Sequence, residues 1–130
     1  AMKGVREFVD AAALCKARGL AVKFLFFGGN ARTPSAPLAF GLRLAGFTQN
    51  VESALRQRAG AGGVDDIVEF YGFQSDLARI YPMMDVLCFP SRLDAPGRPV
   101  FEAAFWAVPS IVALKTPKPD TFVDGETGIA

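Results

Sequence analysis

Short apolar runs alternate along this sequence with segments of helical spacing, and this alternation restricts the fold more than any other feature. The runs are rich in β-favouring residues, and glycine or proline ends most of them. Runs of this kind are typical of parallel strands that are covered on both faces. We expect strands at 21–27, 67–71, 85–89 and 110–114, and the start of a fifth strand at 125–130.

The segments between these runs have the apolar spacing of amphipathic helices. In the first of them Val5, Phe8 and Ala12 recur on one face, and Gly19 follows as a left-handed cap. Strands that alternate with helices predict an α/β fold, here a Rossmann-like, three-layer αβα architecture with a mainly parallel sheet. We expect helices at 4–18, at 50–59, at 75–81 with Ser75 as N-cap, and at 99–107, with irregular chain at 30–47.

Composition excludes several classes of function. At 130 residues and 51% hydrophobic content the chain has the size and core of one globular domain, and its net charge of +1 gives no general attraction to nucleic acid. The sequence has no histidine, so the commonest metal ligand is missing and we expect no metal site. Cys15 and Cys88 lie in apolar patterns and are expected to be buried free thiols, which suits the reducing cytoplasm. No window of the sequence approaches the roughly 20 consecutive apolar residues of a membrane span. We expect Met83, Met84 and Trp106 to lie in the core.

The segment 91–104 is the main candidate for a functional site. A turn-rich loop leads to Pro99, which fits the first position of a helix because its φ is already set. Backbone amides at a helix start can hold an anion. Asp94 precedes this helix and Glu102 lies in its first turn, so carboxylates could bind hydroxyl groups beside a phosphate. The alternative is a loop carboxylate and a glutamate that only stabilises the helix dipole, and the spacing alone leaves both interpretations open.

A series of short motifs follows in order along almost the whole sequence outside 30–47. They are Met2-Lys3-Gly4-Val5, Phe26-Phe27-Gly28-Gly29, Val68 to Gly72 with Asp76-Leu77 and Tyr81, Asp85 to Ser91, Asp94 to Ala103, Pro109 to Ala113, and Asp124 to Gly128. No single motif is specific, but their order and spacing resemble the C-terminal, donor-binding domain of retaining glycosyltransferases of family four (glycosyl transferases group 1). Members of this family have the GT-B fold.

The resemblance implies a site for a nucleotide sugar, which is a substrate and not a cofactor. Glu102 would bind the ribose hydroxyls, and Asp94 would act as the catalytic residue near the reacting carbon of the donor sugar. Lys3 would neutralise the leaving diphosphate and Gly28 would contribute to the donor pocket, although an ordinary lysine and an ordinary turn remain open for these two. The diphosphate would be bound by the helix start formed by Gly97, Arg98, Pro99 and Val100.

The sequence also departs from the family pattern. Asp94 stands where the family usually has a glutamate, so its side chain is one methylene shorter; loss of its contact to the sugar and selection of a different donor both remain open. Thr116-Pro117 and Asp120 stand where the family has paired glycines and a glutamate, and proline has no amide proton to donate. The strand with an arginine that precedes the Lys-Gly pair in the family has no counterpart before Lys3.

We therefore expect residues 1–130 to be a single Rossmann-like domain that is incomplete at both ends. In the complete enzyme a hexosyl group would pass from a nucleotide diphosphate sugar to an acceptor, whereas the chain alone, without an N-terminal acceptor domain, would be inactive. A second copy could pair with strand edges left open or exchange an element, so a homodimer or poor solubility is expected. Two alternatives stay open: a non-catalytic nucleotide-binding or interaction module, and an α/β domain whose similarity reflects packing alone.

Overall fold

The computed structural model describes residues 4–28, 51–93 and 95–130. The chain forms two compact units. One unit combines the first part of the N-terminal helix, up to Ala11, with the chain from Asp76 to Ala130. The other unit runs from Ala12 to Ser75.

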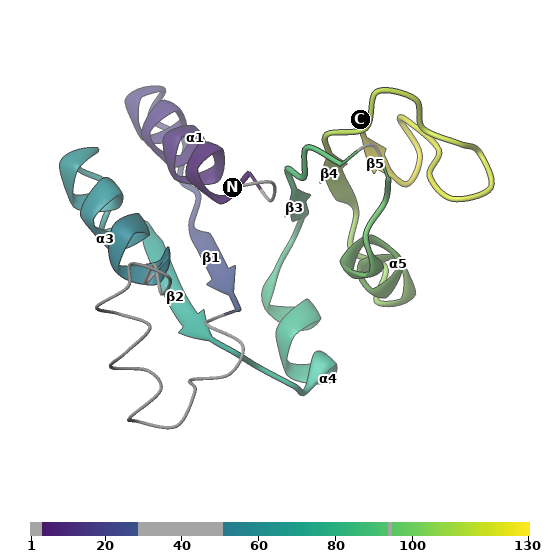
Figure 1. Cartoon of the computed structure of the whole chain (residues 1–130), viewed down its shortest axis with the longest axis horizontal. Helices are drawn as coiled ribbons and strands as arrows, with labels where there is room; N and C mark the ends of the chain where they lie inside the picture. Colours follow the sequence, from purple (N-terminus) through teal and green to yellow (C-terminus); the bar gives the residue numbers. More distant parts are fainter. Residues whose placement is uncertain (1–3, 29–50, 94) are drawn as a thin grey trace, which may run out of the picture. The chain divides into compact units, whose positions relative to one another are not determined.

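Helices and strands alternate in the order that the apolar runs predict (Figure 1). The helices are α1 (Val5–Ala17), α3 (Val51–Ala61), α4 (Leu77–Ile80), the 3₁₀ helix η1 (Tyr81–Met83) and α5 (Arg98–Phe105). The strands are β1 (Phe24–Phe27), β2 (Val68–Gly72), β3 (Leu87–Phe89), β4 (Ser110–Val112) and β5 (Gly128–Ile129). Most strands are shorter than predicted, because a strand extends only as far as its neighbour pairs with it.

All strand pairs in the described residues are parallel, as predicted, but they form two sheets. β1 pairs with β2, and the second sheet has the order β3-β4-β5. The prediction of a mainly parallel arrangement is therefore confirmed, and the described strands divide into two sheets. Apolar runs identify strands, but they do not show which strands pair, because pairing depends on contacts between distant segments.

The end of α1 confirms the left-handed cap predicted at Gly19. Gly19 has a φ of +70° and its amide donates to the carbonyl of Lys16, while the amide of Leu20 donates to the carbonyl of Cys15. These two bonds form a Schellman motif, which only a residue tolerant of positive φ completes without strain. The side chain of Lys16 then reaches Asp66 at 2.6 Å, which fixes the helix end against the turn before β2.

The short helix α4 begins and ends differently from the prediction. Asp76, not Ser75, is its N-cap, because the carboxylate of Asp76 accepts a hydrogen bond from the amide of Ala78 at 3.1 Å. The α-helix stops at Ile80, and Pro82 lies inside the 3₁₀ helix that follows. Serine and aspartate are both good caps, so neighbouring residues of these types cannot be separated by preference alone.

Helix α5 packs on the β3-β4-β5 sheet and forms the core of its unit. Val100 lies with Val112 and Phe122 in one buried cluster. Ala103 lies with Tyr81 and Val108 in a second cluster, against which Met84 packs. These contacts hold the first turn of α5 at the ends of β3 and β4, where ligands of parallel sheets bind.

Four residues predicted to be buried, Met83, Trp106, Cys15 and Cys88, are not fully buried. Met83 is 46% exposed and Trp106 is 37% exposed, so only Met84 of the expected core methionines and tryptophan packs on the core. Cys15 and Cys88 form no disulfide, as predicted, but each is half-buried.

The other unit contains the β1-β2 pair and α3. Its buried apolar residues are Phe24, Leu55, Ala59, Val64 and Val68. Stacked rings join the two strands, with Phe26 on Phe70 at 4.9 Å and Phe27 on Tyr71 at 5.0 Å between centroids.

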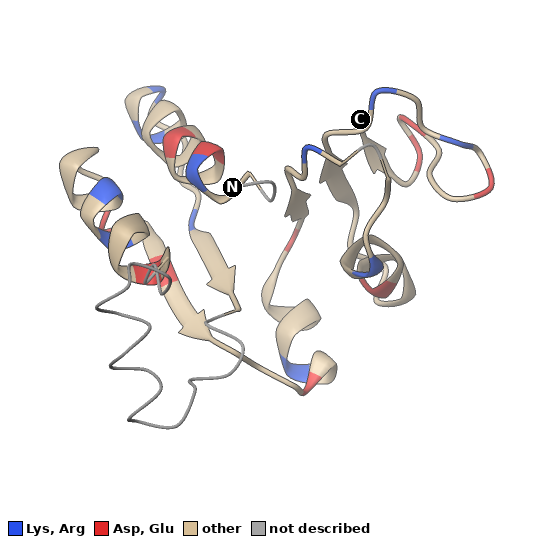
Figure 2. Ribbon diagram, viewed as in Figure 1, with Lys and Arg blue, Asp and Glu red and all other residues tan. Residues whose placement is uncertain are grey.

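Charges of both signs occur on α1, α3 and α5 (Figure 2). No helix within the described ranges combines the length and apolar character that crossing a membrane requires. In the same residues no group of three or more acidic or sulfur-bearing side chains could hold a metal ion.

Candidate functional site

The start of α5 is built around Gly97. This residue is the N-cap, with a φ of −81° and a ψ of 162°, and it makes no capping bond through a side chain. A Cβ added here would lie 2.3 Å from Cζ of Phe89, the last residue of β3. Glycine at this position therefore allows the close approach of the Phe89 ring, which any larger residue would have to displace, and the φ of Gly97 is one that any residue adopts.

The backbone donors at this helix start are fewer than the sequence suggests. Pro99 occupies the second helical position rather than the first, because α5 begins at Arg98. Proline has no N–H, and the amide of Val100 donates to the carbonyl of Gly97 at 2.9 Å. The side chain of Val100 is buried in the core. The amides of Gly97 and Arg98 are thus the remaining donors that an anion could use without replacing that bond.

Glu102 is the fifth residue of α5, so it does not lie in the first turn as predicted. The prediction placed the helix start at Pro99, whereas Arg98 is already helical. A glutamate in the second turn gains little from the helix dipole, which acts mainly within the first turn. The interpretation of Glu102 as a dipole-stabilising residue is therefore weakened, and its carboxylate needs another explanation.

Both oxygens of the Glu102 carboxylate have partners. The hydroxyl of Tyr81 donates to Oε2 at 2.7 Å, and Nε of Arg98 lies 3.0 Å from Oε1. The two partners differ in exposure: Tyr81 is 4% exposed, whereas the Arg98 side chain is 88% exposed. One oxygen is thus held from the core and the other from the solvent side. The Glu102 side chain itself is 20% exposed, so it can still reach a ligand.

The surroundings of Tyr81 keep its hydroxyl protonated. Burial, and then the hydrogen bond to Glu102, raise the pKa of Tyr81 far above its ordinary value. The same hydroxyl lies 3.4 Å from the carbonyl of Pro99, so both of these neighbours are acceptors. The phenol is therefore a permanent donor at the pH of a cell.

The structure brings together only part of the predicted site. Gly97, Arg98, Pro99, Val100 and Glu102 lie within one stretch of α5 and its N-cap. Lys3 and Asp94 lie outside the described residues.

Gly28 belongs to the other unit. There it ends β1 with a φ of +126°, and its amide donates to the carbonyl of Gly72 at 2.8 Å. The turn interpretation of Gly28 accounts for these features.

Two residues at this site were not predicted from the sequence. Phe89 was expected only as part of a strand, and Tyr81 was expected on the apolar face of a short helix and within a family motif, without a role at the site. A signal for Tyr81 existed, because a buried tyrosine requires a partner for its hydroxyl where phenylalanine would not. Nothing in the sequence, however, identifies a partner 21 residues away.

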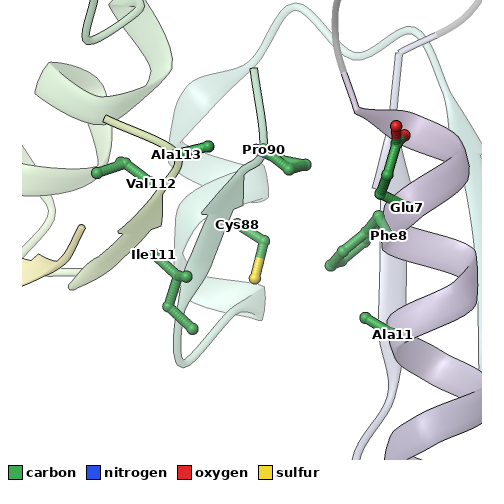
Figure 3. Close-up of a pocket in the computed structure, with 8 residues that line it drawn as sticks. All are labelled: Glu7, Phe8, Ala11, Cys88, Pro90, Ile111, Val112 and Ala113. Atoms are coloured by element: carbon green, nitrogen blue, oxygen red, sulfur yellow. The ribbon is translucent and has the colours of Figure 1, made fainter. Parts of the chain in front are cut away.

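A separate cavity of about 200 Å³ lies between α1 and the strands β3 and β4 (Figure 3). Phe8 and Ala11 of α1 line one side, and Cys88 and Ile111 line the other. Glu7 lies at this cavity and pairs with Arg92, and a backbone hydrogen bond followed by Arg92 lowers the pKa of Glu7. None of the predicted site residues that the structure describes lines this cavity, and its mainly apolar walls offer little to a diphosphate.

Comparison with solved structures identifies the fold. The crystal structure of Anabaena HepE in complex with UDP matches 98% of this chain at 24% identity and a TM-score of 0.70. A glycosyltransferase from Rickettsia africae matches 99% of it at 18% identity and a TM-score of 0.67. The chain spans about a third of their length, 31% of HepE and 30% of the Rickettsia protein. The predicted fold class, a Rossmann-like half of a GT-B glycosyltransferase, is confirmed by this likeness.

Sequence comparison gives the family. No curated protein is similar enough to be matched to the chain. The family described as glycosyl transferases group 1 matches residues 1–130, the whole of the sequence. The order of motifs, the fold and this match agree, and the chain belongs to the group 1 glycosyl transferases.

Proposed function

We propose that this chain is the donor-binding part of a retaining glycosyltransferase, which transfers a hexosyl group from a nucleoside diphosphate sugar. The observation that carries the proposal is the Glu102 carboxylate, which is held beside the start of α5 by Tyr81 and Arg98. A carboxylate offers acceptors to two adjacent hydroxyls, and a helix start favours an anion. The pair suits a ribose next to a diphosphate. The solved structure of HepE, which has the same fold, contains UDP.

In this proposal different described residues bind different parts of the donor. Glu102 accepts hydrogen bonds from the ribose hydroxyls. The amides of Gly97 and Arg98, together with the exposed guanidinium of Arg98, bind the diphosphate. Pro99 and Val100 shape the turn that presents these amides, and the buried Val100 side chain anchors it.

The remaining predicted residues keep the roles that the family resemblance implies. Lys3 neutralises the diphosphate as it leaves, which is an electrostatic contribution to the transition state. Asp94 would act as the catalytic carboxylate at the anomeric carbon, and Gly28 would contribute to donor binding. The sugar donor is consumed as a substrate, so no cofactor is required.

Transfer needs more than this chain in the proposed mechanism. In GT-B enzymes the acceptor binds in a cleft between two domains, and the chain corresponds to less than a third of HepE. We therefore expect donor binding without transfer. Transfer of sugar from UDP-glucose or GDP-mannose by the chain alone would contradict this part of the proposal.

Calorimetric titration with UDP, GDP and ADP tests the donor site. We expect one of these nucleotides to bind, and we expect Glu102→Gln to weaken that binding at least about tenfold, because hydrogen bonds to a charged acceptor are lost. Glu126→Gln is the matched control, since it removes the same charge from an exposed position of the same unit. The donor site is ruled out if none of the three nucleotides binds, or if both variants weaken binding equally.

A further inference from the structure

The hydroxyl of Tyr81 has a role that packing alone does not require. Tyr81 is buried with Ala103 and Val108, where a phenylalanine ring would fill the same space. Its hydroxyl instead donates to Oε2 of Glu102, which is 21 residues further along the chain. A tyrosine therefore connects the η1 segment to the one carboxylate of the proposed donor site that the structure describes.

We propose that Tyr81 is the positioning residue of the donor site and orients the Glu102 carboxylate for the two hydroxyls of a ribose. The inference rests on the proposed function, because it assigns Tyr81 a role in recognising the ribose. It concerns the pentose only, and it makes no claim about the base or the transferred sugar.

The geometry gives the two oxygens of Glu102 different tasks. The ring of Tyr81 is packed in the core, so its hydroxyl is a fixed point. Oε2 is held by that point, whereas Oε1 is held by a guanidinium that is almost fully exposed and can move away. A ribose hydroxyl can thus replace Arg98 at Oε1 while Tyr81 keeps the carboxylate in place. The free Arg98 can then turn to the diphosphate.

The hydrogen bond from the Tyr81 phenol still leaves Glu102 able to bind a ribose. A carboxylate accepts up to about four hydrogen bonds, so the bond from Tyr81 leaves room for two ribose hydroxyls. A side chain that is already ordered loses less conformational entropy when a ligand binds. The effect of Tyr81 should therefore appear only with ligands that carry the ribose hydroxyls.

The test compares UDP with 2′,3′-dideoxy-UDP on the wild type, on Tyr81→Phe and on Tyr71→Phe. The test starts with UDP and its dideoxy form. If the wild type binds GDP or ADP more tightly than UDP, that nucleotide and its own dideoxy form are used instead. Tyr71 is the other tyrosine of the sequence, and its hydroxyl also donates to a glutamate, Glu69, in the other unit. Tyr71→Phe is therefore a matched control. We expect Tyr81→Phe to weaken binding of the nucleotide roughly tenfold and to leave binding of the dideoxy nucleotide unchanged. We expect Tyr71→Phe to change neither.

The outcomes separate this inference from the proposed function. Wild-type binding that Glu102→Gln weakens, but that Tyr81→Phe leaves unchanged, overturns the role of Tyr81 alone. Equal weakening of both nucleotides by Tyr81→Phe also overturns it, since a general loss of structure would act in that way. If no nucleoside diphosphate binds to the wild type, both proposals are wrong.

A measurement on the wild type keeps the inference testable if Tyr81→Phe does not fold. The buried hydroxyl proton of Tyr81 should exchange slowly with solvent and give its own NMR signal, with and without UDP. Loss of this signal when UDP binds would show that Tyr81 releases Glu102, which contradicts the inference.

Discussion

Ala107 is strained by the way in which α5 ends. Among the described residues other than glycine, only Ala107 has a positive φ, 56°. Its amide donates to the carbonyl of Ala104, and the amide of Val108 donates to the carbonyl of Ala103. These bonds form a Schellman motif with alanine in the position that glycine usually occupies. The strain is tolerated because Val108 and Ala103 bury each other beneath the turn.

Ala107→Gly is therefore expected to stabilise the protein. An L-residue at this φ costs about 1 kcal/mol, and glycine removes most of that cost. Urea unfolding followed through the fluorescence of Trp106, the only tryptophan of the sequence, should show a higher midpoint with an unchanged slope.

Ala104→Gly supplies the matched control for this substitution. Ala104 is an exposed residue in the last turn of the same helix, so glycine there should destabilise by up to about 0.5–1 kcal/mol. The change in the free energy of unfolding should therefore have opposite signs in the two variants, because Ala107 has a positive φ and Ala104 does not. Equal destabilisation by both would contradict the account.

At the scale of elements, a charged network spans β2 and the residue before β1. The carboxylate of Glu69 accepts hydrogen bonds from Lys23 at 2.6 Å and from the hydroxyl of Tyr71 at 2.7 Å. The bond from Lys23, and then the bond from Tyr71, lower the pKa of Glu69 below its ordinary value of 4.5. The bond to Glu69 raises the pKa of both Lys23 and Tyr71.

The signs of these shifts predict how stability depends on pH. Because the pKa of Glu69 is lowered by folding, its contribution is present above its ordinary pKa and is lost as the pH falls through the lowered value. Because the pKa values of Lys23 and Tyr71 are raised, their contribution is present at neutral pH and is lost in alkali. We expect a stability maximum near neutrality, and we expect Glu69→Gln to flatten both sides of it.

Urea unfolding followed by far-UV circular dichroism between about pH 3 and pH 7 measures the acid side. Tyr71→Phe removes one of the two donors to Glu69 and should give a slope between those of the wild type and Glu69→Gln. The prediction is wrong if Glu69→Gln loses as much stability in acid as the wild type does.

The helices α1 and α5 illustrate which features could be predicted from the sequence and which could not. Gly19 was predicted as a cap because the signal is local: a glycine directly after a helix with a basic last turn. The α5 helix was predicted for the same reason, from Gly97, Pro99 and the apolar run behind them. The start of that helix was misplaced by one residue, and this error moved Glu102 from the first turn to the second.

The contacts of the site could not be predicted, since they join segments that are distant in sequence. Phe89 and Gly97 meet because β3 and α5 pack together, and Tyr81 meets Glu102 because η1 packs on α5. A sequence shows that a residue is apolar or can donate a hydrogen bond. Which partner it finds depends on the packing of whole elements.

At the scale of the whole molecule, the parallel strands leave edges unpaired within the described residues. The β1-β2 sheet consists of two strands, and β3 and β5 are the outer strands of the other sheet. Exposed strand edges favour pairing with another chain. We propose that copies of this chain associate through such edges.

Sedimentation velocity over a wide range of protein concentration tests this association. The mean sedimentation coefficient should rise with concentration. Ile129→Lys should reduce the rise, because Ile129 is 62% exposed on the outer strand β5 and lysine on an edge opposes strand pairing. A single monomeric species at every concentration would show that the edges do not pair.

The exposed ion pair between Arg98 and Glu102 has a consequence for ionic strength. Added salt screens the attraction of the start of α5 for a diphosphate, which weakens binding. The same salt weakens the ion pair between Arg98 and Oε1 of Glu102, so this oxygen accepts a hydrogen bond from a ribose hydroxyl more easily. The two effects oppose each other, so nucleotide affinity at the proposed donor site should vary with salt less steeply than the charge of the ligand alone would suggest.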